Sequence, residues 1–184
     1  MSAARTEVRF GGFGGQGIVL AGTLLGKAAS LYDGKEAVFT QSYGPEARGG
    51  ASRADVIIAT EPVDYPYVTQ PDVLAVLFQE AYGRFAADLR PEALLIIEQD
   101  LVTPEPGAAA LALPATRIAE ELGRRIVANV VLLGCVVAQT ALVSRDAVEQ
   151  AIRDTVKPDA VALNLEALSA GLEFSAPAVG GATA

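Results

Sequence analysis

The sequence predicts an α/β fold in which a mostly parallel, mixed sheet is followed by a helical C-terminal part. Apolar strand-like runs alternate with helix-like segments in the first half of the chain, and helix-like segments dominate the second half. Hydrophobic residues make up 51% of the 184 residues, as expected for strands covered on both faces or for a large interface with another chain. We expect one domain over residues 1–174 and a disordered tail over residues 175–184.

The elements follow one another along the chain. A strand over Val8–Phe10 runs into a glycine-rich segment, and a helix over Ile18–Leu31 follows it. The later strands are expected over Ala37–Thr40, Asp55–Ala59, Val73–Leu77, Leu94–Ile97 and Ala109–Leu113. The later helices are expected over Gln79–Leu89, Thr116–Gly123, Ala128–Leu142, a segment after Ser144, and Asn164–Ala170. Thr116 and Ser144 are suited to cap helices, and Gly171 to end one.

The second and third strands are expected to run antiparallel. The polar, glycine-rich loop Gln41–Ala51 between them is short for a parallel crossover, which takes about a dozen residues or more and usually contains a helix. The two strands are therefore predicted to be antiparallel neighbours, or to be joined through one short turn at Pro45–Arg48. This connection makes the sheet mixed in an otherwise Rossmann-like arrangement.

Composition and charge argue against several classes of protein. Basic residues number 14 and acidic residues 22, a net charge of −8, so no nucleic-acid partner is expected. The absence of histidine and the single cysteine, Cys135, argue against zinc, iron–sulfur or haem sites in this chain. The lone cysteine and the lack of an apolar signal core near the start predict a reducing, cytoplasmic location. Polar residues interrupt the apolar stretch Ile126–Val143, which is interpreted as a buried helix and not as a membrane span.

A glycine-rich segment offers the clearest candidate for a ligand site. Gly12, Gly14 and Gly17 fit the pattern G-x-G-x-x-G directly after a strand and directly before a helix. Glycines let the backbone approach a phosphate, and the start of a helix supplies free N–H donors. The alternative is a tight turn that binds no ligand. NAD is disfavoured because the acidic residue of the second strand, Glu36, stands at its beginning, whereas the dinucleotide fingerprint requires one at its end.

Two more residues are candidates for this site. Loops that leave neighbouring strands meet at one edge of a sheet, so the second glycine-rich loop is expected beside the first. Arg48 in that loop could bind a phosphate or carboxylate, or form an ion pair with Glu46 or a neighbouring chain. Asn129, on an apolar helix, needs a hydrogen-bond partner, which is either backbone or a ligand.

Side chains for catalysis are scarce. Histidine, the commonest general base, is missing. Cys135 lies in an apolar run that should bury it, so it is interpreted as core packing and not as a nucleophile. Carboxylates near strand ends are interpreted as solvated surface residues: Asp72, Glu80, Glu98 and Asp100. We expect no catalytic residue in this chain, which therefore acts as one part of a larger enzyme.

Four ordered segments carry a resemblance to a known family. They are GGFGGQGIVLAG (Gly11–Gly22), QSYGPEARGGASRADVIIA (Gln41–Ala59), PDVLAVL (Pro71–Leu77) and ANVVLLG (Ala128–Gly134). Together they resemble the gamma subunit of 2-oxoacid:acceptor (ferredoxin) oxidoreductases, over nearly the whole chain from Val8 to Gly171. The glycine segment alone would be a weak signal, whereas four motifs in order are a strong one.

The resemblance implies a complex that oxidatively decarboxylates a 2-oxoacid, forms an acyl-CoA and passes electrons to ferredoxin or a similar acceptor. Thiamine diphosphate, magnesium and iron–sulfur clusters would be bound by alpha and beta chains and by an iron–sulfur chain or domain. In this chain, coenzyme A is the possible ligand. The residues expected to bind it are Gly12, Gly14, Gly15, Gln16, Gly17, Arg48 and Asn129.

Several alternatives stay open. The glycine segment and the second loop could be packing surfaces for the partner chains. The chain could also be a free-standing nucleotide-binding module. Within the family, the segment QSYGPEARGGASRADV and Asp64-Tyr65-Pro66 favour 2-oxoglutarate as the substrate. Pyruvate, aryl-glyoxylate, indolepyruvate and branched-chain 2-oxoacids would use similar gamma chains.

Overall fold

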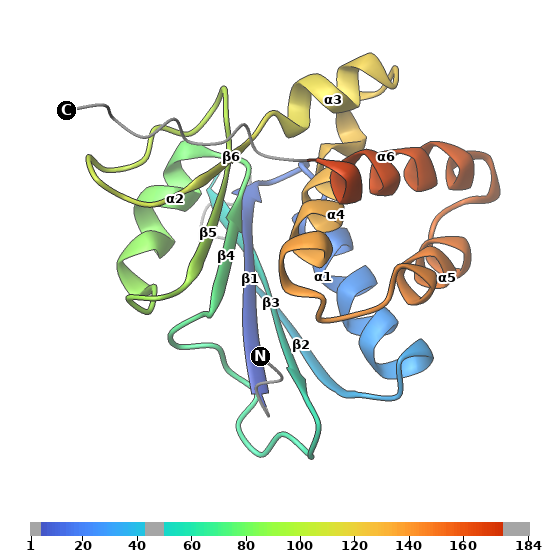
Figure 1. The fold of residues 1–184 in the computed structure, drawn as a ribbon, viewed down its shortest axis with the longest axis horizontal. Coiled ribbons are helices and arrows are strands. Elements are labelled where there is room, and N and C mark those ends of the chain that lie inside the picture. The colour runs from blue at the N-terminus through green and yellow to red at the C-terminus, as the bar shows by residue number, and fades with distance from the viewer. Residues whose placement is uncertain (1–4, 43–49, 175–184) are drawn as a thin grey trace.

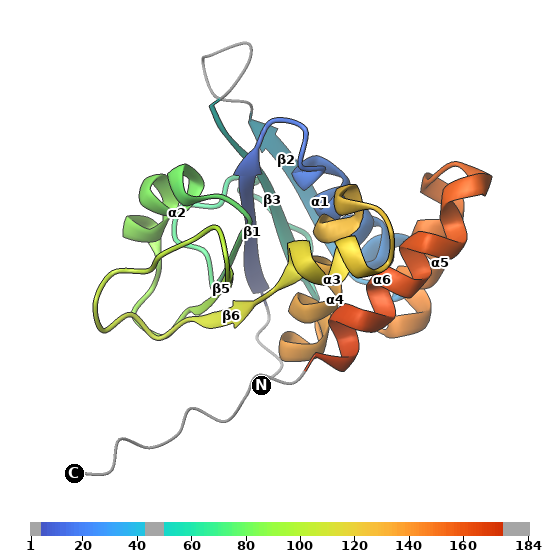
Figure 2. The same cartoon turned by 90° about the horizontal axis from the view of Figure 1, so that it is seen from above.

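A six-stranded mixed sheet forms the centre of the molecule. The computed structural model describes residues 5–42 and 50–174, and within these ranges the strand order is β2-β3-β1-β4-β5-β6. Helix α2 lies on one side of the sheet and α1, α4, α5 and α6 lie on the other (Figure 1; Figure 2). The predicted α/β fold with a mixed sheet and a helical C-terminal part is confirmed.

Each predicted strand is present, with different ends. The strands are β1 (Arg5–Phe13), β2 (Glu36–Ser42), β3 (Ala51–Ala59), β4 (Val73–Val76), β5 (Leu94–Glu98) and β6 (Leu111–Leu113). β1, β4, β5 and β6 are parallel neighbours, whereas β3 runs antiparallel to both β1 and β2. The prediction that the second and third strands are antiparallel neighbours is therefore confirmed.

The first strand is longer than its apolar run indicated. β1 pairs with β3 from Arg5 opposite Ala59 to Phe13 opposite Ala51, so Gly11 and Gly12 belong to the strand and not to the loop after it. Glycine is needed there because neighbours approach closely: a Cβ at Gly12 would lie 2.6 Å from Cγ1 of Ile18. The pairing with β3 supplies the hydrogen bonds that make this glycine stretch extended.

The helices also differ from the prediction in their ends. They are α1 (Ile18–Lys27) with a π-helical end (Ala28–Tyr32), α2 (Gln79–Phe85), α3 (Ala115–Glu121), α4 (Ala128–Thr140), α5 (Arg145–Thr155) and α6 (Val161–Glu173). Short 3₁₀ turns lie at Ala86–Asp88, Arg125–Val127 and Pro158–Ala160. The predicted cap at Ser144 is confirmed, because its hydroxyl accepts a hydrogen bond from the Ala147 N–H at 3.2 Å.

Two predicted helix signals are wrong. Gly171 does not end a helix, because α6 continues to Glu173. Thr116 does not cap α3, which begins after Pro114; the Thr116 N–H instead donates to the Glu98 carboxylate at 3.2 Å. In both places a contact with a distant segment decides the local structure.

Helices α4 and α6 cross with their backbones in contact. A Cβ at Gly134 of α4 would lie 2.5 Å from the Leu168 carbonyl oxygen, and one at Gly171 of α6 would overlap the Val131 carbonyl. The first ten residues of α4, from Ala128 to Val137, are all buried, and all of them except Asn129 and Gly134 belong to the larger core cluster. No helix in the described part of the chain is long and apolar enough to cross a membrane.

A buried charge network connects the sheet to the segments near α2. Arg9 of β1 is 1% exposed and binds both carboxylate oxygens of Asp55 on β3, at 2.8 and 3.0 Å. Its guanidinium also donates to Asp88 at 3.1 Å and to the Val68 carbonyl at 2.8 Å. Burial alone would lower the pKa of Arg9, but the hydrogen bonds and charges of Asp55 and Asp88 outweigh it and raise that pKa. Arg9 therefore stays charged and joins two strands to the segments beside α2.

Candidate functional site

The glycine turn, residues Phe13–Gly17, joins the carboxyl end of β1 to α1. Gly15 and Gly17 have φ angles of +100° and +74°, a region that favours glycine. A Cβ at Gly14 or Gly15 would meet no atom within 4 Å, so these residues leave open space beside the turn. The first N–H groups of α1 have no carbonyl partner within the helix and carry partial positive charge, as at any helix start. The local geometry is suited to an anion.

Gln16 holds this turn against the sheet. Its Oε1 accepts a hydrogen bond from the Phe13 N–H at 2.7 Å, and its Nε2 donates to the Leu77 carbonyl at 3.3 Å. Leu77 directly follows β4, the strand beside β1. Gln16 was predicted to bind a ligand; the structure shows its amide bonded to the turn and to the end of β4.

Asn129 fixes the other end of the turn. It is 2% exposed at the start of α4, and its Nδ2 donates to the Gly17 carbonyl at 2.9 Å. Its Oδ1 accepts from the Val130 N–H at 2.9 Å. A side chain at Gly17 would collide with this amide. Of the two partners considered for Asn129, backbone or ligand, the structure shows the backbone, 112 residues away in sequence.

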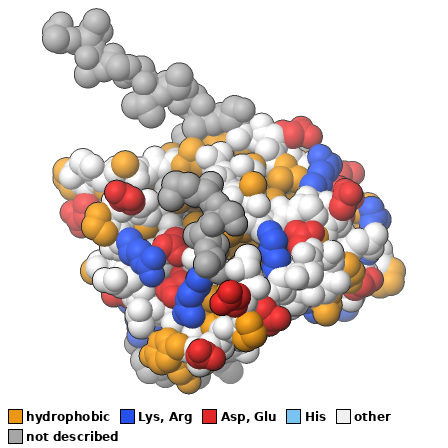
Figure 3. All heavy atoms as spheres, turned by 60° about the horizontal axis from the view of Figure 1, so that its bottom comes forward, with side chains coloured by type: hydrophobic (Ala, Val, Ile, Leu, Met, Phe, Trp, Pro, Cys, Tyr) orange, Lys and Arg blue, Asp and Glu red, His pale blue; other side chains and the backbone are white. Residues whose placement is uncertain are grey.

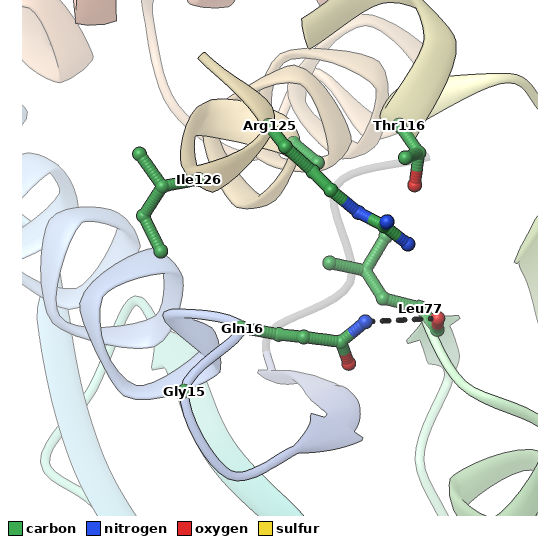
Figure 4. A pocket seen from close by; sticks show the side chains of 7 residues that line it. Gly15, Gln16, Leu77, Thr116, Arg125 and Ile126 are labelled. Atoms are coloured by element: carbon green, nitrogen blue, oxygen red, sulfur yellow. Dashed lines mark hydrogen bonds between the residues drawn. The ribbon is translucent and has the colours of Figure 1, made fainter. Parts of the chain in front are cut away.

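A cavity of about 250 Å³ lies between the glycine turn and the segment that leads into α4. It is lined by Gly15, Gln16, Leu77, Thr116, Arg125, Ile126 and Ala128. Figure 4 shows the Arg125 guanidinium reaching across this space toward Leu77, with Gln16 and Thr116 beside it. The cavity therefore combines open glycine backbone, an apolar wall and one cation.

Arg125 is a residue that the sequence reasoning missed. It lies in the 3₁₀ turn that precedes α4, and its ion pair with Glu120 is long, 3.9 Å. A signal for it existed in the sequence: Asn129 was already expected at the glycine segment, and Arg125 stands one helical turn before it. A cation there had to lie near the same edge of the sheet.

The second glycine-rich loop is only partly described. Arg48 lies outside the described residues, as does the suggested turn at Pro45–Arg48. The chain enters this loop after Ser42 of β2 and leaves it before Ala51 of β3, which stands opposite Phe13. The two ends of the loop are therefore at the same edge of the sheet as the glycine turn, as predicted.

One carboxylate interpreted as a solvated surface group is buried. Glu98, at the end of β5, is 0% exposed. Its oxygens accept hydrogen bonds from the N–H groups of Asp100, Leu101 and Thr116, at 2.7, 2.8 and 3.2 Å. The interpretation was wrong because the start of α3 folds over the end of this strand. Glu98 thereby positions Thr116 at the cavity.

Other candidates for chemistry are accounted for by packing. Burial raises the pKa of the Cys135 thiol to about 12, so the group stays protonated at neutral pH. Glu36 pairs with Ala59 at the edge of the sheet opposite the glycine turn, which is the wrong position for an NAD ribose. No group of three or more His, Cys, Asp or Glu residues suited to a metal ion occurs in residues 5–42 and 50–174.

A larger hollow lies at the amino ends of the strands. It has a volume of about 610 Å³ and includes Asp72 and Arg90 in its lining, but these two already pair with each other at 2.8 Å. On this side of the molecule, basic side chains lie among acidic ones (Figure 3). The cation of this lining is already paired and Glu92 adds a further negative charge, so the cavity at the glycine turn is the better candidate for an anionic ligand.

Comparisons with known proteins agree with this fold. The family model described as pyruvate ferredoxin/flavodoxin oxidoreductase matches residues 7–174. The 2-oxoglutarate synthase subunit KorC of Methanocaldococcus jannaschii is 49% identical over 176 residues, which cover 93% of this chain and 94% of that protein.

Two solved structures are similar. A keto/oxoacid ferredoxin oxidoreductase gamma subunit from Geobacter sulfurreducens PCA has a TM-score of 0.84 and 46% identity, covering 93% of this chain and 96% of that one. A 2-oxoglutarate:ferredoxin oxidoreductase from Magnetococcus marinus, solved with 2-oxoglutarate, coenzyme A and succinyl-CoA, has a TM-score of 0.83. At 23% identity, over 93% of this chain and 31% of that one, it shows the fold alone. The resemblance predicted from the sequence is confirmed.

Proposed function

The chain belongs to the pyruvate ferredoxin/flavodoxin oxidoreductase family, and on that premise we propose that it is the gamma subunit of a 2-oxoglutarate:ferredoxin oxidoreductase. The observation that carries the proposal is the 49% identity, over almost the full length of both chains, to a subunit named for 2-oxoglutarate synthase. The reaction would be oxidative decarboxylation of 2-oxoglutarate to succinyl-CoA and CO₂, with electrons passed to ferredoxin or a similar acceptor.

The chemistry of this chain supports a subunit that acts together with others. It has no histidine, and its one thiol is buried with its pKa raised to about 12. General acid–base or nucleophilic catalysis by this chain alone lacks its usual groups. Thiamine diphosphate, magnesium and iron–sulfur clusters would lie on alpha and beta chains and an iron–sulfur chain or domain.

Coenzyme A is the ligand that we propose for the glycine turn. Gly14 and Gly15 leave the backbone open, and the start of α1 favours a diphosphate. Gln16 and Asn129 hold that backbone in place, so their role is to position the donors. Gly12 acts by letting β1 pass close to Ile18, and Arg48 is proposed as a further phosphate partner from the second loop.

Purification of the tagged chain from its own cells tests the assembly and the substrate. We expect companion chains identified by mass spectrometry to bring thiamine diphosphate and iron–sulfur clusters, and the complex to reduce ferredoxin with 2-oxoglutarate and CoA. A panel of pyruvate, branched-chain 2-oxoacids, aryl-glyoxylate and indolepyruvate measures selectivity. Higher kcat/KM for another acid would reject 2-oxoglutarate, and a solitary monomer that binds nucleotide would favour the free-standing module.

A substitution at the turn tests the binding of CoA. Gly14→Val places a branched side chain where a Cβ now meets no atom within 4 Å, so folding and assembly should survive. We expect the KM for CoA to rise while the KM for 2-oxoglutarate stays the same. Gly83→Val, at an exposed site in α2, is the matched control. Unchanged CoA affinity in Gly14→Val, with assembly intact, would contradict the proposed ligand.

A further inference from the structure

We propose that the connection between β3 and β4, residues 60–72, carries a docking surface for a basic region of a companion chain in the complex. Its centre is the exposed ring pair of Tyr65 and Tyr67, named here the tyrosine knob. This inference rests on the proposed function, because it takes from it that the chain works in an assembly. It concerns the end of the sheet that the glycine turn does not occupy.

The tyrosine knob lies at the amino ends of the parallel strands. β3 ends at Ala59, which stands opposite Arg5 at the start of β1, and β4 begins at Val73, beside Val8. Figure 1 shows the connection beyond this end of the sheet, near the start of β1. The segment Asp64-Tyr65-Pro66, which the sequence associates with 2-oxoglutarate, is therefore a whole strand away from the glycine turn. Its contribution to the enzyme has to come through another contact.

Two arginines of β1 hold the backbone of the knob in place. The Arg5 guanidinium donates to the Tyr65 carbonyl at 3.1 Å, and the buried Arg9 guanidinium donates to the Val68 carbonyl at 2.8 Å. No helix or strand occurs within residues 60–72, so these hydrogen bonds and the proline between the two tyrosines restrict its shape. A segment held in this way loses little conformational entropy when a partner binds.

The two rings of the knob are large surfaces left in water. Tyr65 is 56% exposed and Tyr67 57% exposed, although their centroids lie 5.5 Å apart in an edge-to-face contact. Tyrosine is enriched among the residues that contribute most to binding at protein interfaces, because it buries a large ring and keeps a hydroxyl for a polar contact. A ring pair that is both exposed and held in place therefore indicates a protein partner.

Carboxylates near the knob favour a basic partner. Glu61 and Asp64 belong to the same connection, and Glu92 lines the larger hollow at the amino ends of the strands, together with Gln70. All three carboxylates are exposed. Within residues 5–42 and 50–174 none of the three forms an ion pair. They are therefore open to a cation from another chain.

The two arginines at this end of the sheet are already paired. Arg5 binds Glu7 at 2.9 Å, and Arg90 binds Asp72 at 2.8 Å. A lysine or arginine of the partner would enter the hollow beside Glu92 and would lie near rings whose faces attract cations. An acidic surface would be repelled here, and so would a second copy of this chain, which has a net charge of −8. The occupant is therefore a basic region of a companion chain.

Stepwise dilution of the purified complex tests the knob. Mass photometry measures the concentration at which half of the complexes have lost this chain. For the double variant Tyr65→Ala/Tyr67→Ala we expect that concentration to rise about 30-fold or more, as for the loss of a binding hot spot. Alanine keeps the carbonyl that Arg5 binds, so the chain should still fold, which its thermal unfolding checks. Leu31→Ala removes an apolar side chain that is 64% exposed at the end of α1 and should change nothing.

Salt tests the charge of the partner. Raising the NaCl concentration should weaken the wild-type assembly, because exposed charge pairs are screened. At low salt, Asp64→Asn/Glu92→Gln should raise the half-dissociation concentration about 2-fold to 5-fold, and its dependence on NaCl should be weaker than that of the wild type. Asp159→Asn, at an exposed carboxylate before α6, is the matched control and should match the wild type. A wild-type assembly that NaCl does not weaken would overturn the basic partner.

Steady-state kinetics separate docking from ligand binding. At concentrations where the complex is intact, the double tyrosine variant should keep wild-type KM values for 2-oxoglutarate and for CoA, because the knob is remote from the glycine turn. A raised KM for 2-oxoglutarate in the intact complex would mean that the segment acts on the substrate, and would overturn the inference.

The outcomes distinguish this inference from the proposed function. A double tyrosine variant that keeps its companion chains to the same dilution as the wild type, or a Leu31→Ala variant that loses them equally, would overturn the inference. Self-association of the isolated chain that the tyrosine substitutions abolish would assign the knob to a second copy and would overturn it too. The proposed function stands in each case if the complex forms succinyl-CoA. A wild-type chain that purifies without companions would reject the proposed function itself.

Discussion

The crossing of α4 and α6 and the glycine turn both depend on glycine, for opposite reasons. At the crossing, Gly134 and Gly171 remove side-chain volume so that two helix backbones touch. At the turn, Gly14 and Gly15 face open space, and Gly17 supplies a positive φ. The first arrangement leaves no room for side chains between the two helices, whereas the second leaves open space beside a cavity. The same residue type therefore indicates packing in one region and a ligand site in the other.

The largest effect should come from the helix crossing. Gly171→Ala forces a methyl group into the Val131 carbonyl, which belongs to a backbone that cannot move aside. We expect a loss of about 3 kcal/mol in the free energy of unfolding, at the upper end for overpacked sites. Urea unfolding measures it. Gly83→Ala, at an exposed position in the middle of α2 where a Cβ meets no atom within 4 Å, should instead stabilise the chain by about 0.5–1 kcal/mol. Equal effects at the two glycines would contradict the comparison.

Gly17→Ala should have the next largest effect. Its φ of +74° is unfavourable for alanine, and the new methyl group displaces the Asn129 amide. We expect a loss of about 2 kcal/mol, from the left-handed conformation together with a weakened hydrogen bond. Thermal unfolding of Gly14→Ala provides the comparison, because that site is open and should change by less than about 0.5 kcal/mol. A tolerated Gly17→Ala would mean that the turn does not need its observed geometry.

Asn129→Ala tests the contact of the glycine turn with α4. It removes the amide that joins α4 to the Gly17 carbonyl. We expect a loss of about 1–2 kcal/mol in chemical unfolding, together with a raised KM for CoA in the complex. Asn164→Ala removes an amide that bonds within α6, to the Ala160 carbonyl, and should leave the KM for CoA unchanged. A raised KM in both variants would indicate a general loss of stability.

The smallest expected effect is a loss of stability at high pH that depends on the buried thiol of helix α4. Burial raises the pKa of Cys135 from 9.0 to about 12. A raised pKa favours the protonated thiol in the folded state, so this stabilisation is complete below pH 9 and declines as the pH rises toward 12. Relative to Cys135→Val, the wild type should lose about 1 kcal/mol between pH 8 and roughly pH 9.5. Identical pH dependence of the two proteins would show that the thiol is not buried.

Local patterns predicted the elements but not their contacts. Apolar runs located every strand, and the short loop after the second strand predicted an antiparallel pair. The extension of β1 through Gly11 and Gly12 was missed because it depends on β3, about 40 residues later. Arg9 stood out in no motif, since its main partner Asp55 is 46 residues away. Its position as a charged residue inside a predicted strand was the signal that could have indicated a buried ion pair.

In the candidate site, too, the residues with a local signal were predicted and those placed by distant contacts were not. The glycine segment and Asn129 were found because each is anomalous where it stands, as open backbone or as a polar residue on an apolar helix. Glu98 and Arg125 are ordinary charged residues, and only the fold brings them to the glycine turn. Glu98 has no local pattern that sets it apart, whereas Arg125 could be found only through its position one helical turn before Asn129.

The central claim is that this chain supplies a ligand-binding surface while other polypeptides supply the reactive groups. Formation of succinyl-CoA from 2-oxoglutarate, CoA and oxidised ferredoxin tests it most directly, measured for the purified chain, for the partner chains without it, and for the complete complex. The account predicts that only the complete complex forms succinyl-CoA at full rate, and that the chain alone forms none. Turnover by the isolated chain would contradict it.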